Sequence, residues 1–219
     1  MRVDTRKLCV LAMMSALAFI LAAYVRLSIV PVVAFLRYDP KDIIIVIAGF
    51  IYGPLAAFVV TMVVSFVQMF TISQTGYIGL LMNIIASTAF CCTAALIYKN
   101  NRTIKGAILG LIIGGIFATA VMMMWNYIVT PIFLNIPRSD VVPLLLPGFL
   151  PFNLISNGLN VVLTILLYKR VKFILKAAGM MPTAEEEGGN KVSSKGIVLS
   201  VLFIALTCTL WVLILVGVL

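Results

Sequence analysis

Long apolar stretches without a single charge dominate the pattern of this chain. From Ile43 to Tyr98 there is no Asp, Glu, Lys or Arg, and the whole sequence lacks His. A charged side chain is costly in hydrocarbon, so the charges of a membrane protein collect at the ends of its spans. The pattern predicts a multi-pass membrane protein whose spans hold no proton relay, ion-coupling site or metal site.

The apolar stretches divide into helices that approach the ~20 residues of a membrane span. The segment 43–52 is too short to cross a membrane upright, and Gly53-Pro54 ends it and starts the next helix. The proline-rich segment PIFLNIPRSDVVPLLLPGFLP predicts an outer loop with room for one short helix. The expected spans are 8–27, 43–52, 54–71, 77–98, 104–129, 152–175 and 197–219.

These spans predict an all-α integral membrane protein, a six-helix bundle with an extra C-terminal transmembrane helix. The bundle takes residues 1–176, and the extra helix takes 197–219. The segment MPTAEEEGGNKVSSKG is polar and rich in Gly and Glu, so 177–196 is expected to be a flexible cytoplasmic linker. Basic residues precede the first apolar run as in a signal peptide, but its length and the lack of a clear cleavage site favour a retained span.

Composition and charge support the membrane interpretation. The chain is 63% hydrophobic and 11% charged, far from the balance of a soluble domain. Its formal charge of +9 does not indicate nucleic-acid binding, because Lys and Arg stand in small groups at span ends. Most of them fall on one side, which predicts a cytoplasmic N-terminus. The cytoplasmic group is Arg2, Arg6, Lys7, Lys99, Arg102, Lys105, Lys169, Arg170, Lys172, Lys176, Lys191 and Lys195; Arg26, Arg37, Lys41 and Arg138 fall on the other side.

The sequence lacks the motifs of common catalytic sites. There is no G-x-x-x-x-G-K-[ST], no H-E-x-x-H and no G-x-S-x-G. The cysteines, Cys9, Cys91, Cys92 and Cys208, form no C-x-x-C pair, so neither a zinc site nor a disulfide framework is expected. We therefore expect no enzyme, and any solute transport must take its energy from another chain.

Amide side chains gather near the outer ends of two spans. Asn126 stands in WNYIVTP, while Asn153, Asn157 and Asn160 share one helical face with Ser156 beside them. For any single amide, bonding between helices is the simpler interpretation. As a group among aromatic residues, they suit a flat neutral ligand with a hydrogen-bonding edge, such as a pyrimidine or flavin ring. The aromatic residues are Trp125, Tyr127, Phe149 and Phe152.

Two further patterns concern packing and capping. Small residues at four-residue spacing let helix backbones approach closely. The span 104–129 carries a ladder of such residues, which predicts packing inside the protein. In the first span, Ala12 and Ala16 have the same spacing, and a position facing a partner is as well supported as internal packing. Asp39, Lys41 and Asp42 stand where the second span begins, and the carboxylate of Asp42 suits a helix N-terminus. The ladder is Gly106, Gly110, Gly114 and Ala118.

Four segments together resemble a known family. They are FLRYDPKDIIIVIAGFIYGPLAAF, TGYIGLLMN, WNYIVTP and LPFNLISNGLNVVLTILLYKRV, and the resemblance covers about 7–176. The family is the riboflavin-specific substrate-binding subunits (S components, RibU type) of energy-coupling factor (ECF) transporters. The resemblance implies a six-helix bundle in the bacterial cytoplasmic membrane with the vitamin bound near the outer face. It also implies a partner module of one membrane scaffold subunit and two cytoplasmic ATPases.

The resemblance also implies roles for individual residues. Asn126 and Asn153 match the flavin-contacting amides, and Ala12 and Ala16 match the helix motif that contacts the scaffold. The loop 35–42 matches the segment that closes the site. Two positions depart from the family pattern: Ser156 replaces a frequent Lys, and Leu80 replaces a frequent Glu. The further candidate ligand-binding residues are Tyr38, Leu36, Thr130, Gly79 and Asn157.

The expected function is capture of riboflavin, as a transported ligand rather than a cofactor, for ATP-driven uptake through the partner module. Whether FMN also binds stays open. One alternative is the same machine with another vitamin or related molecule, such as thiamine or a deazapurine. A second is a membrane scaffold that binds no ligand. Quenching of flavin fluorescence by the purified protein separates these alternatives.

Overall fold

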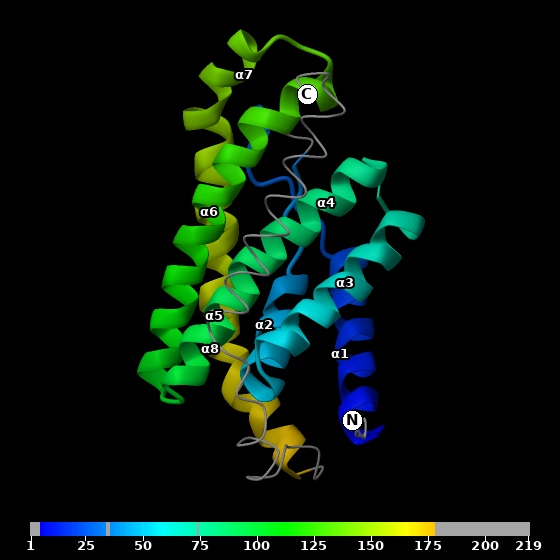
Figure 1. The fold of residues 1–219 in the computed structure, drawn as a ribbon, viewed down its shortest axis with the longest axis vertical. Coiled ribbons are helices and arrows are strands. Elements are labelled where there is room, and N and C mark those ends of the chain that lie inside the picture. The colour runs from blue at the N-terminus through cyan, green and yellow to red at the C-terminus, as the bar shows by residue number, and fades with distance from the viewer. Residues whose placement is uncertain (1–4, 34–35, 74, 178–219) are drawn as a thin grey trace.

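The computed structural model describes residues 5–33, 36–73 and 75–177, which form a bundle of long helices (Figure 1). The predicted helix 197–219, and the predicted linker 177–196 beyond its first residue, lie outside the described residues. The helices are α1 (Thr5–Tyr24), α2 (Lys41–Tyr52), α3 (Pro54–Thr71), α4 (Gly76–Ser87), α5 (Thr93–Asn100), α6 (Ile104–Leu134), α7 (Arg138–Leu144) and α8 (Leu150–Ala177). A 3₁₀ turn, η1 (Pro31–Val33), and two π-helical segments, η2 (Thr88–Cys92) and η3 (Leu145–Phe149), complete the described elements.

The bundle has two distinct ends. At the proximal end α1 begins and α8 ends, and at the distal end α1, α3 and α6 end while α2 and α4 begin (Figure 1). Within the described residues, five helical stretches are long and apolar enough to cross a membrane. This confirms the all-α membrane class. The stretches are Thr5–Tyr24, Pro54–Thr71, Gly76–Asn100, Ile104–Leu134 and Arg138–Tyr168.

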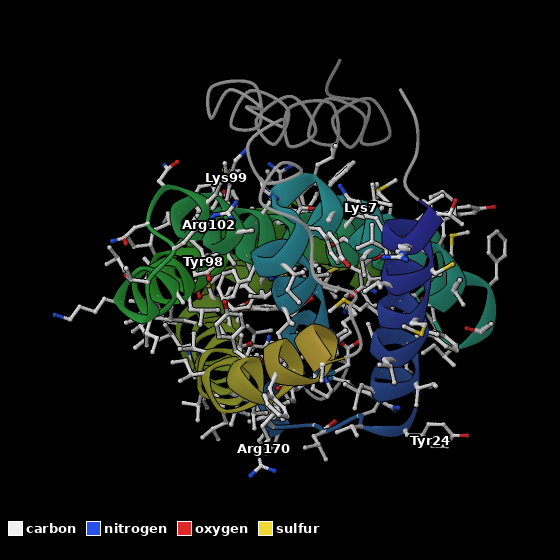
Figure 2. All side chains as sticks on the ribbon, turned by 90° about the horizontal axis from the view of Figure 1, so that it is seen from below. Lys7, Tyr24, Tyr98, Lys99, Arg102 and Arg170 are labelled. Atoms are coloured by element: carbon white, nitrogen blue, oxygen red, sulfur yellow. The ribbon has the colours of Figure 1, made fainter. Side chains whose placement is uncertain are left out.

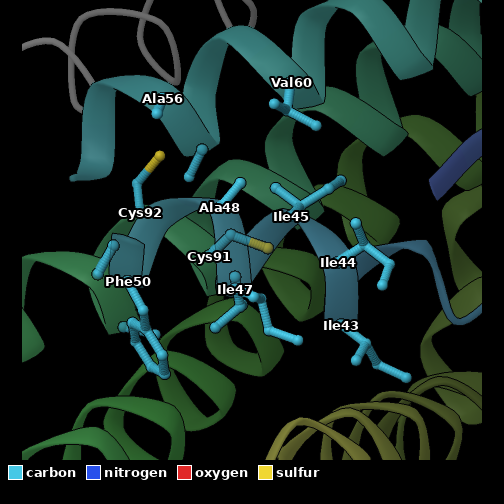
Figure 3. Close-up of a cluster of buried hydrophobic side chains, with 14 of the residues drawn as sticks. Ile43, Ile44, Ile45, Ile47, Ala48, Phe50, Ala56, Val60, Cys91 and Cys92 are labelled. Carbon is cyan, nitrogen blue, oxygen red and sulfur yellow. The ribbon is translucent and has the colours of Figure 1, made fainter. Parts of the chain in front are cut away.

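Helix α2 lies in the centre of the bundle. It has 12 residues, and at 1.5 Å per residue it is only about 18 Å long, as its sequence predicted. Every residue from Ile43 to Ile51 is buried. Figure 3 shows Ile45 and Ala48 on the side of α2 that faces α3, while Ile43, Ile47 and Phe50 point to the opposite side. A helix that is apolar all round must be buried all round. Because α2 is short, the chain segment before it must descend into the bundle to reach it.

The turn between α2 and α3 depends on one glycine. Gly53 has φ 91°, which a side chain would strain, and its N–H donates to the carbonyl of Gly49 at 2.8 Å. Pro54 then occupies the first turn of α3, where its missing N–H costs nothing. The predicted span 54–71 coincides with α3.

The glycine ladder of α6 packs inside the protein, as predicted. A Cβ on Gly110 would lie 2.7 Å from the carbonyl oxygen of Ala94, and a Cβ on Gly114 would lie 2.7 Å from that of Phe90. Both distances are shorter than a van der Waals contact. The glycines therefore let the α6 backbone approach α5 and η2 directly.

The prediction of an outer loop after 129 is wrong for most of its length. Helix α6 continues through Pro131 and stops at Asn135, which has the left-handed φ of 54°. From Arg138 the chain is helical again through α7, η3 and α8. A proline ring inside an α-helix clashes with the carbonyl four residues earlier, and the wider π-helical turn of η3, which contains Pro147, relieves that crowding.

Candidate functional site

A cavity of about 160 Å³ opens at the distal end of the bundle. The segment between α1 and α2 forms one wall, and α3, α4 and α6 form the others. Of the residues predicted for the site, it contains Leu36, Gly79 and Thr130. Its lining is Arg26, Leu36, Arg37, Asp39, Gln68, Ser73, Thr75, Ile78, Gly79, Met82, Asn83, Val129, Thr130 and Phe133. We call this the distal cavity.

One part of the lining of the distal cavity is apolar. Ile78 and Met82 come from α4, one turn apart, and Val129 and Phe133 stand at the same spacing on α6. Leu36 adds an aliphatic side chain from the segment before α2. Apolar and aromatic surface of this kind suits the faces of a ring system.

The other part is polar and is organised by an ion pair whose ammonium is buried. The ammonium of Lys41, whose residue is only 4% exposed, lies 2.7 Å from Asp39 Oδ1. Lys41 Nζ also donates to Asn83 Oδ1 at 3.1 Å, and Gln68 Nε2 donates to Asp39 Oδ2 at 3.2 Å. Buried charges persist only when they are paired and hydrogen-bonded. The pair therefore fixes two amides, Gln68 and Asn83, in the cavity wall.

Neighbouring contacts tie this wall to the rest of the distal end. Arg26 Nη1 donates to the carbonyl of Ile72 at 3.0 Å and thereby joins the residue after α3 to the chain after α1. Ser73 and Thr75 hydrogen-bond each other through their hydroxyls at 3.2 Å. Asp42 lies in the first turn of α2 as predicted, and it accepts a hydrogen bond from Ser87 rather than capping the helix with its side chain.

Tyr38 fastens the segment before α2 to α8. Its backbone pairs with Leu27 through two hydrogen bonds of 2.8 and 3.0 Å, and its hydroxyl donates to Asn160 Oδ1 at 2.9 Å. Burial, together with the nearby carboxylates of Asp42 and Asp39, raises the pKa of Tyr38 to about 12. The hydroxyl therefore remains a protonated donor near neutral pH. This contact could not be read from helical periodicity, which placed Asn160 only on a shared face.

Asn126 lies directly behind the lining of the distal cavity. Its Nδ2 donates to the carbonyl of Met122 at 2.8 Å, and its Oδ1 accepts from Thr130 Oγ1 at 3.2 Å. Thr130 lines the cavity, so Asn126 orients a cavity hydroxyl. Asn153 is buried on α8, where its Nδ2 donates to the carbonyl of Phe149 at 2.8 Å. It is not part of the cavity lining.

The remaining predicted amide, Asn157, serves a contact between helices. Asn157 Nδ2 donates to Gly115 O at 3.3 Å and to Thr119 Oγ1 at 3.0 Å, which joins α8 to α6. The hydroxyl of Ser156 is buried, with no hydrogen-bond partner among the described residues. The predicted site thus divides into a group at the cavity and a group along α8.

Sequence reasoning missed five polar residues of the distal cavity: Arg26, Gln68, Ser73, Thr75 and Asn83. Gln68 carried a usable signal, because it is an isolated amide in the charge-free stretch and such groups need a partner. Asn83 lies in the segment TGYIGLLMN, which carries the resemblance to the family but no pattern that singles out this amide.

The predicted partner-facing residues of α1 lie on its outer surface. Ala12 and Ala16 are both exposed, whereas Ala18 and Ala22 on the same helix are completely buried. The first pair therefore does not serve packing within the described bundle. Large apolar side chains flank it: Leu8, Met13, Leu17 and Ile20 are also exposed.

The family model of the substrate-specific component of ECF transporters matches residues 6–168. The chain belongs to this family. This S component is 32% identical to the "Riboflavin transporter RibU" of Staphylococcus aureus (strain TCH60), over 79% of this chain and 94% of that protein. It is 30% identical to the "Riboflavin transporter FmnP" of Bacillus subtilis (strain 168), over 76% and 92%.

A solved structure gives the same result for the fold. It is the S component of a bacterial ECF transporter, and it is similar to this S component with a TM-score of 0.68 and 32% identity. The match covers 78% of this chain and 97% of the solved one. The resemblance that the sequence motifs indicated is confirmed at the level of the family, and the protein is a multi-pass membrane component of a transporter.

Proposed function

We propose that this S component binds riboflavin in the distal cavity and passes it to an ATP-driven ECF module for uptake. One observation carries the proposal: an apolar surface and a fixed row of polar groups face one cavity at the end where the segment before α2 covers the bundle. A flavin has the same division, with a flat ring system and hydrogen-bonding groups at its edge and on its hydroxylated chain. Relatives that span nearly the same length are named riboflavin transporters.

Binding requires the distal cavity to widen. Its volume of about 160 Å³ is below the roughly 300–1,000 Å³ of typical ligand pockets. The segment before α2 is held to the bundle by the hydrogen bond from Tyr38 to Asn160, by the contact of Asp39 with Gln68 and by apolar packing of Val30 and Val33. We expect this segment to move outward for entry and to close over the bound flavin.

The charge distribution supports an orientation with the distal cavity on the outer side. Figure 2, seen from below, labels Lys7, Lys99, Arg102 and Arg170, which belong to the start of α1, the last turn of α5, the α5–α6 connection and the last turns of α8. These segments share the proximal end. Because basic residues are retained on the cytoplasmic side, the N-terminus is cytoplasmic in this proposal.

Energy coupling requires partners in this proposal. The sequence contains no phosphate-binding loop, so ATP hydrolysis is assigned to two cytoplasmic ATPases acting through a membrane scaffold subunit. The exposed Ala12 and Ala16 support a scaffold contact on α1, because small side chains let a partner helix approach closely in a membrane.

The decisive experiment is a titration of purified protein with riboflavin, followed by quenching of flavin fluorescence. We expect saturable binding with submicromolar affinity that excess thiamine does not reverse, and FMN is titrated in parallel. Displacement by thiamine or a deazapurine would assign the cavity to another small molecule. Absence of binding by any of these compounds would support a scaffold role instead.

A further inference from the structure

We propose that Gln68 and Asn83 recognise the hydroxylated side chain of the flavin, and that they set the preference for a flavin with such a chain over the bare ring. This inference rests on the proposed function and deepens it. It assigns a specificity role to α3 and α4, on which the predicted amides Asn126, Asn153 and Asn157 do not lie.

The orientation of Gln68 is fixed by chemistry. The carboxylate of Asp39 is bound to the ammonium of Lys41 and can only accept hydrogen bonds, so the group facing Asp39 Oδ2 must be the Gln68 NH₂. Gln68 Oε1 is then turned away from Asp39. It is buried without a hydrogen-bond partner among the described residues, in a side chain that is 2% exposed and lines the cavity. A buried acceptor of this kind is costly until a donor reaches it.

Asn83 is oriented by the same ion pair. Lys41 Nζ can only donate, so it must face Asn83 Oδ1, and the Asn83 NH₂ is directed elsewhere. Asn83 also lines the cavity. The two residues of the wall therefore turn an acceptor from Gln68 and a donor from Asn83 away from the ion pair, and neither amide can flip without placing like groups against Asp39 or Lys41. Gln68 Oε1 is fully covered in this arrangement, so a ligand reaches it only when the cavity widens.

A chain of hydroxyl groups matches this wall better than the ring edge alone. Each hydroxyl donates one hydrogen bond and accepts others, so successive hydroxyls can satisfy Gln68 Oε1 and the Asn83 NH₂ together. The hydroxyls of Ser73 and Thr75 extend the polar lining on the same cavity. The apolar residues of α4 and α6, such as Met82 and Phe133, remain for the ring faces.

The test compares riboflavin with lumiflavin, which has the same ring but no hydroxylated chain, on the full-length purified protein. Gln68→Met keeps the length and shape of the side chain and removes its amide. We expect the Kd for riboflavin to rise about 5- to 150-fold, while the Kd for lumiflavin stays within about twofold of wild type. Asn83→Asp keeps the acceptor for Lys41 but removes the donor, and the same selective loss is expected.

The matched control is Thr61→Val, on the same helix, α3, as Gln68. Thr61 is buried, its Oγ1 has no hydrogen-bond partner among the described residues, and it lies outside the cavity lining. It should leave both affinities unchanged. Thermal unfolding and gel filtration of each variant show whether it is folded, independently of ligand binding.

Three results would overturn the inference, and a fourth concerns the proposed function itself. Equal loss of both ligands in folded variants would mean that the wall holds the ring. Unchanged riboflavin affinity in both variants would remove these amides from recognition. Wild-type protein that binds lumiflavin as tightly as riboflavin would show that the hydroxylated side chain of the flavin contributes nothing to recognition. If wild-type protein binds neither flavin, the proposed function fails.

Discussion

Removal of the Tyr38 hydroxyl tests how the segment before α2 controls the distal cavity. Tyr38→Phe deletes one oxygen and keeps the ring. It breaks the 2.9 Å hydrogen bond to Asn160 and leaves Asn160 Oδ1 without this donor. Asn160 is only 3% exposed, so water does not readily replace the lost donor. An unsatisfied buried acceptor costs about 1–3 kcal/mol. The backbone pairing of Tyr38 with Leu27 is unaffected, so the segment should loosen rather than unfold.

The binding free energy for riboflavin should weaken by at most the same ~1–3 kcal/mol. If only the closed arrangement binds tightly, the apparent Kd rises in proportion to the lost population of closed protein, up to about 5- to 150-fold. Fluorescence quenching measures the Kd, and stopped-flow release should show most of the change in the dissociation rate. Asn160→Leu should have a similar effect, and the double variant should cost little more than either single change.

Tyr98→Phe is the matched control. Tyr98 is also buried and shares a 2.5 Å hydroxyl hydrogen bond, with Tyr168, but it lies near the proximal end. The control should lower thermal stability without changing riboflavin affinity. Equal affinity loss in the Tyr98 and Tyr38 variants, or strictly additive effects of the changes at Tyr38 and Asn160, would refute the role of this contact in closing the cavity.

Four further predictions follow from the site and the packing. Asn126→Ala should raise the Kd for riboflavin about 5- to 150-fold, measured by titration, because it leaves the Thr130 hydroxyl of the cavity without its acceptor, and Asn153→Ala, which lies outside the cavity lining, tests by the same titration the ligand contact that the resemblance implies. Ala12→Trp should abolish uptake in cells that carry the partner module while binding to purified protein stays normal, because the bulk prevents close helix approach. Gly110→Ala should lower the thermal unfolding temperature, because its Cβ would meet the carbonyl of Ala94 at 2.7 Å. Deletion of 181–219, which lies outside the described residues, should leave riboflavin binding intact.

Each of these predictions has an outcome that contradicts it. Unchanged affinity in both amide variants would make those amides structural. Normal uptake with Ala12→Trp would place that face against lipid. Gly158→Ala, where nothing lies within 4 Å of the added Cβ, is the control for Gly110→Ala, and equal effects would remove close packing as the cause. Loss of binding on deletion would assign the C-terminal segment a part in the site.

The sequence by itself determined the elements of this bundle. Charge exclusion from hydrocarbon places span ends directly, and the Gly53-Pro54 pair sets the start of α3 at the predicted residue because both residues restrict the backbone locally. Close spacing of glycines also predicted internal packing correctly for α6. The prolines after 129 misled the prediction, because Pro131 and Pro143 stand inside α-helices and the π-helical turn η3 accommodates Pro147.

Only the tertiary structure decided which polar residues meet. In a membrane protein the lipid is as apolar as the interior, so hydrophobic periodicity does not reveal which face of a helix points inward. Asp39, Gln68 and Asn83 come from three separate elements, and nothing local in the sequence places them together. The buried charge of Lys41 joins them, because a charge removed from water is stable only when an opposite charge and hydrogen-bonding groups surround it.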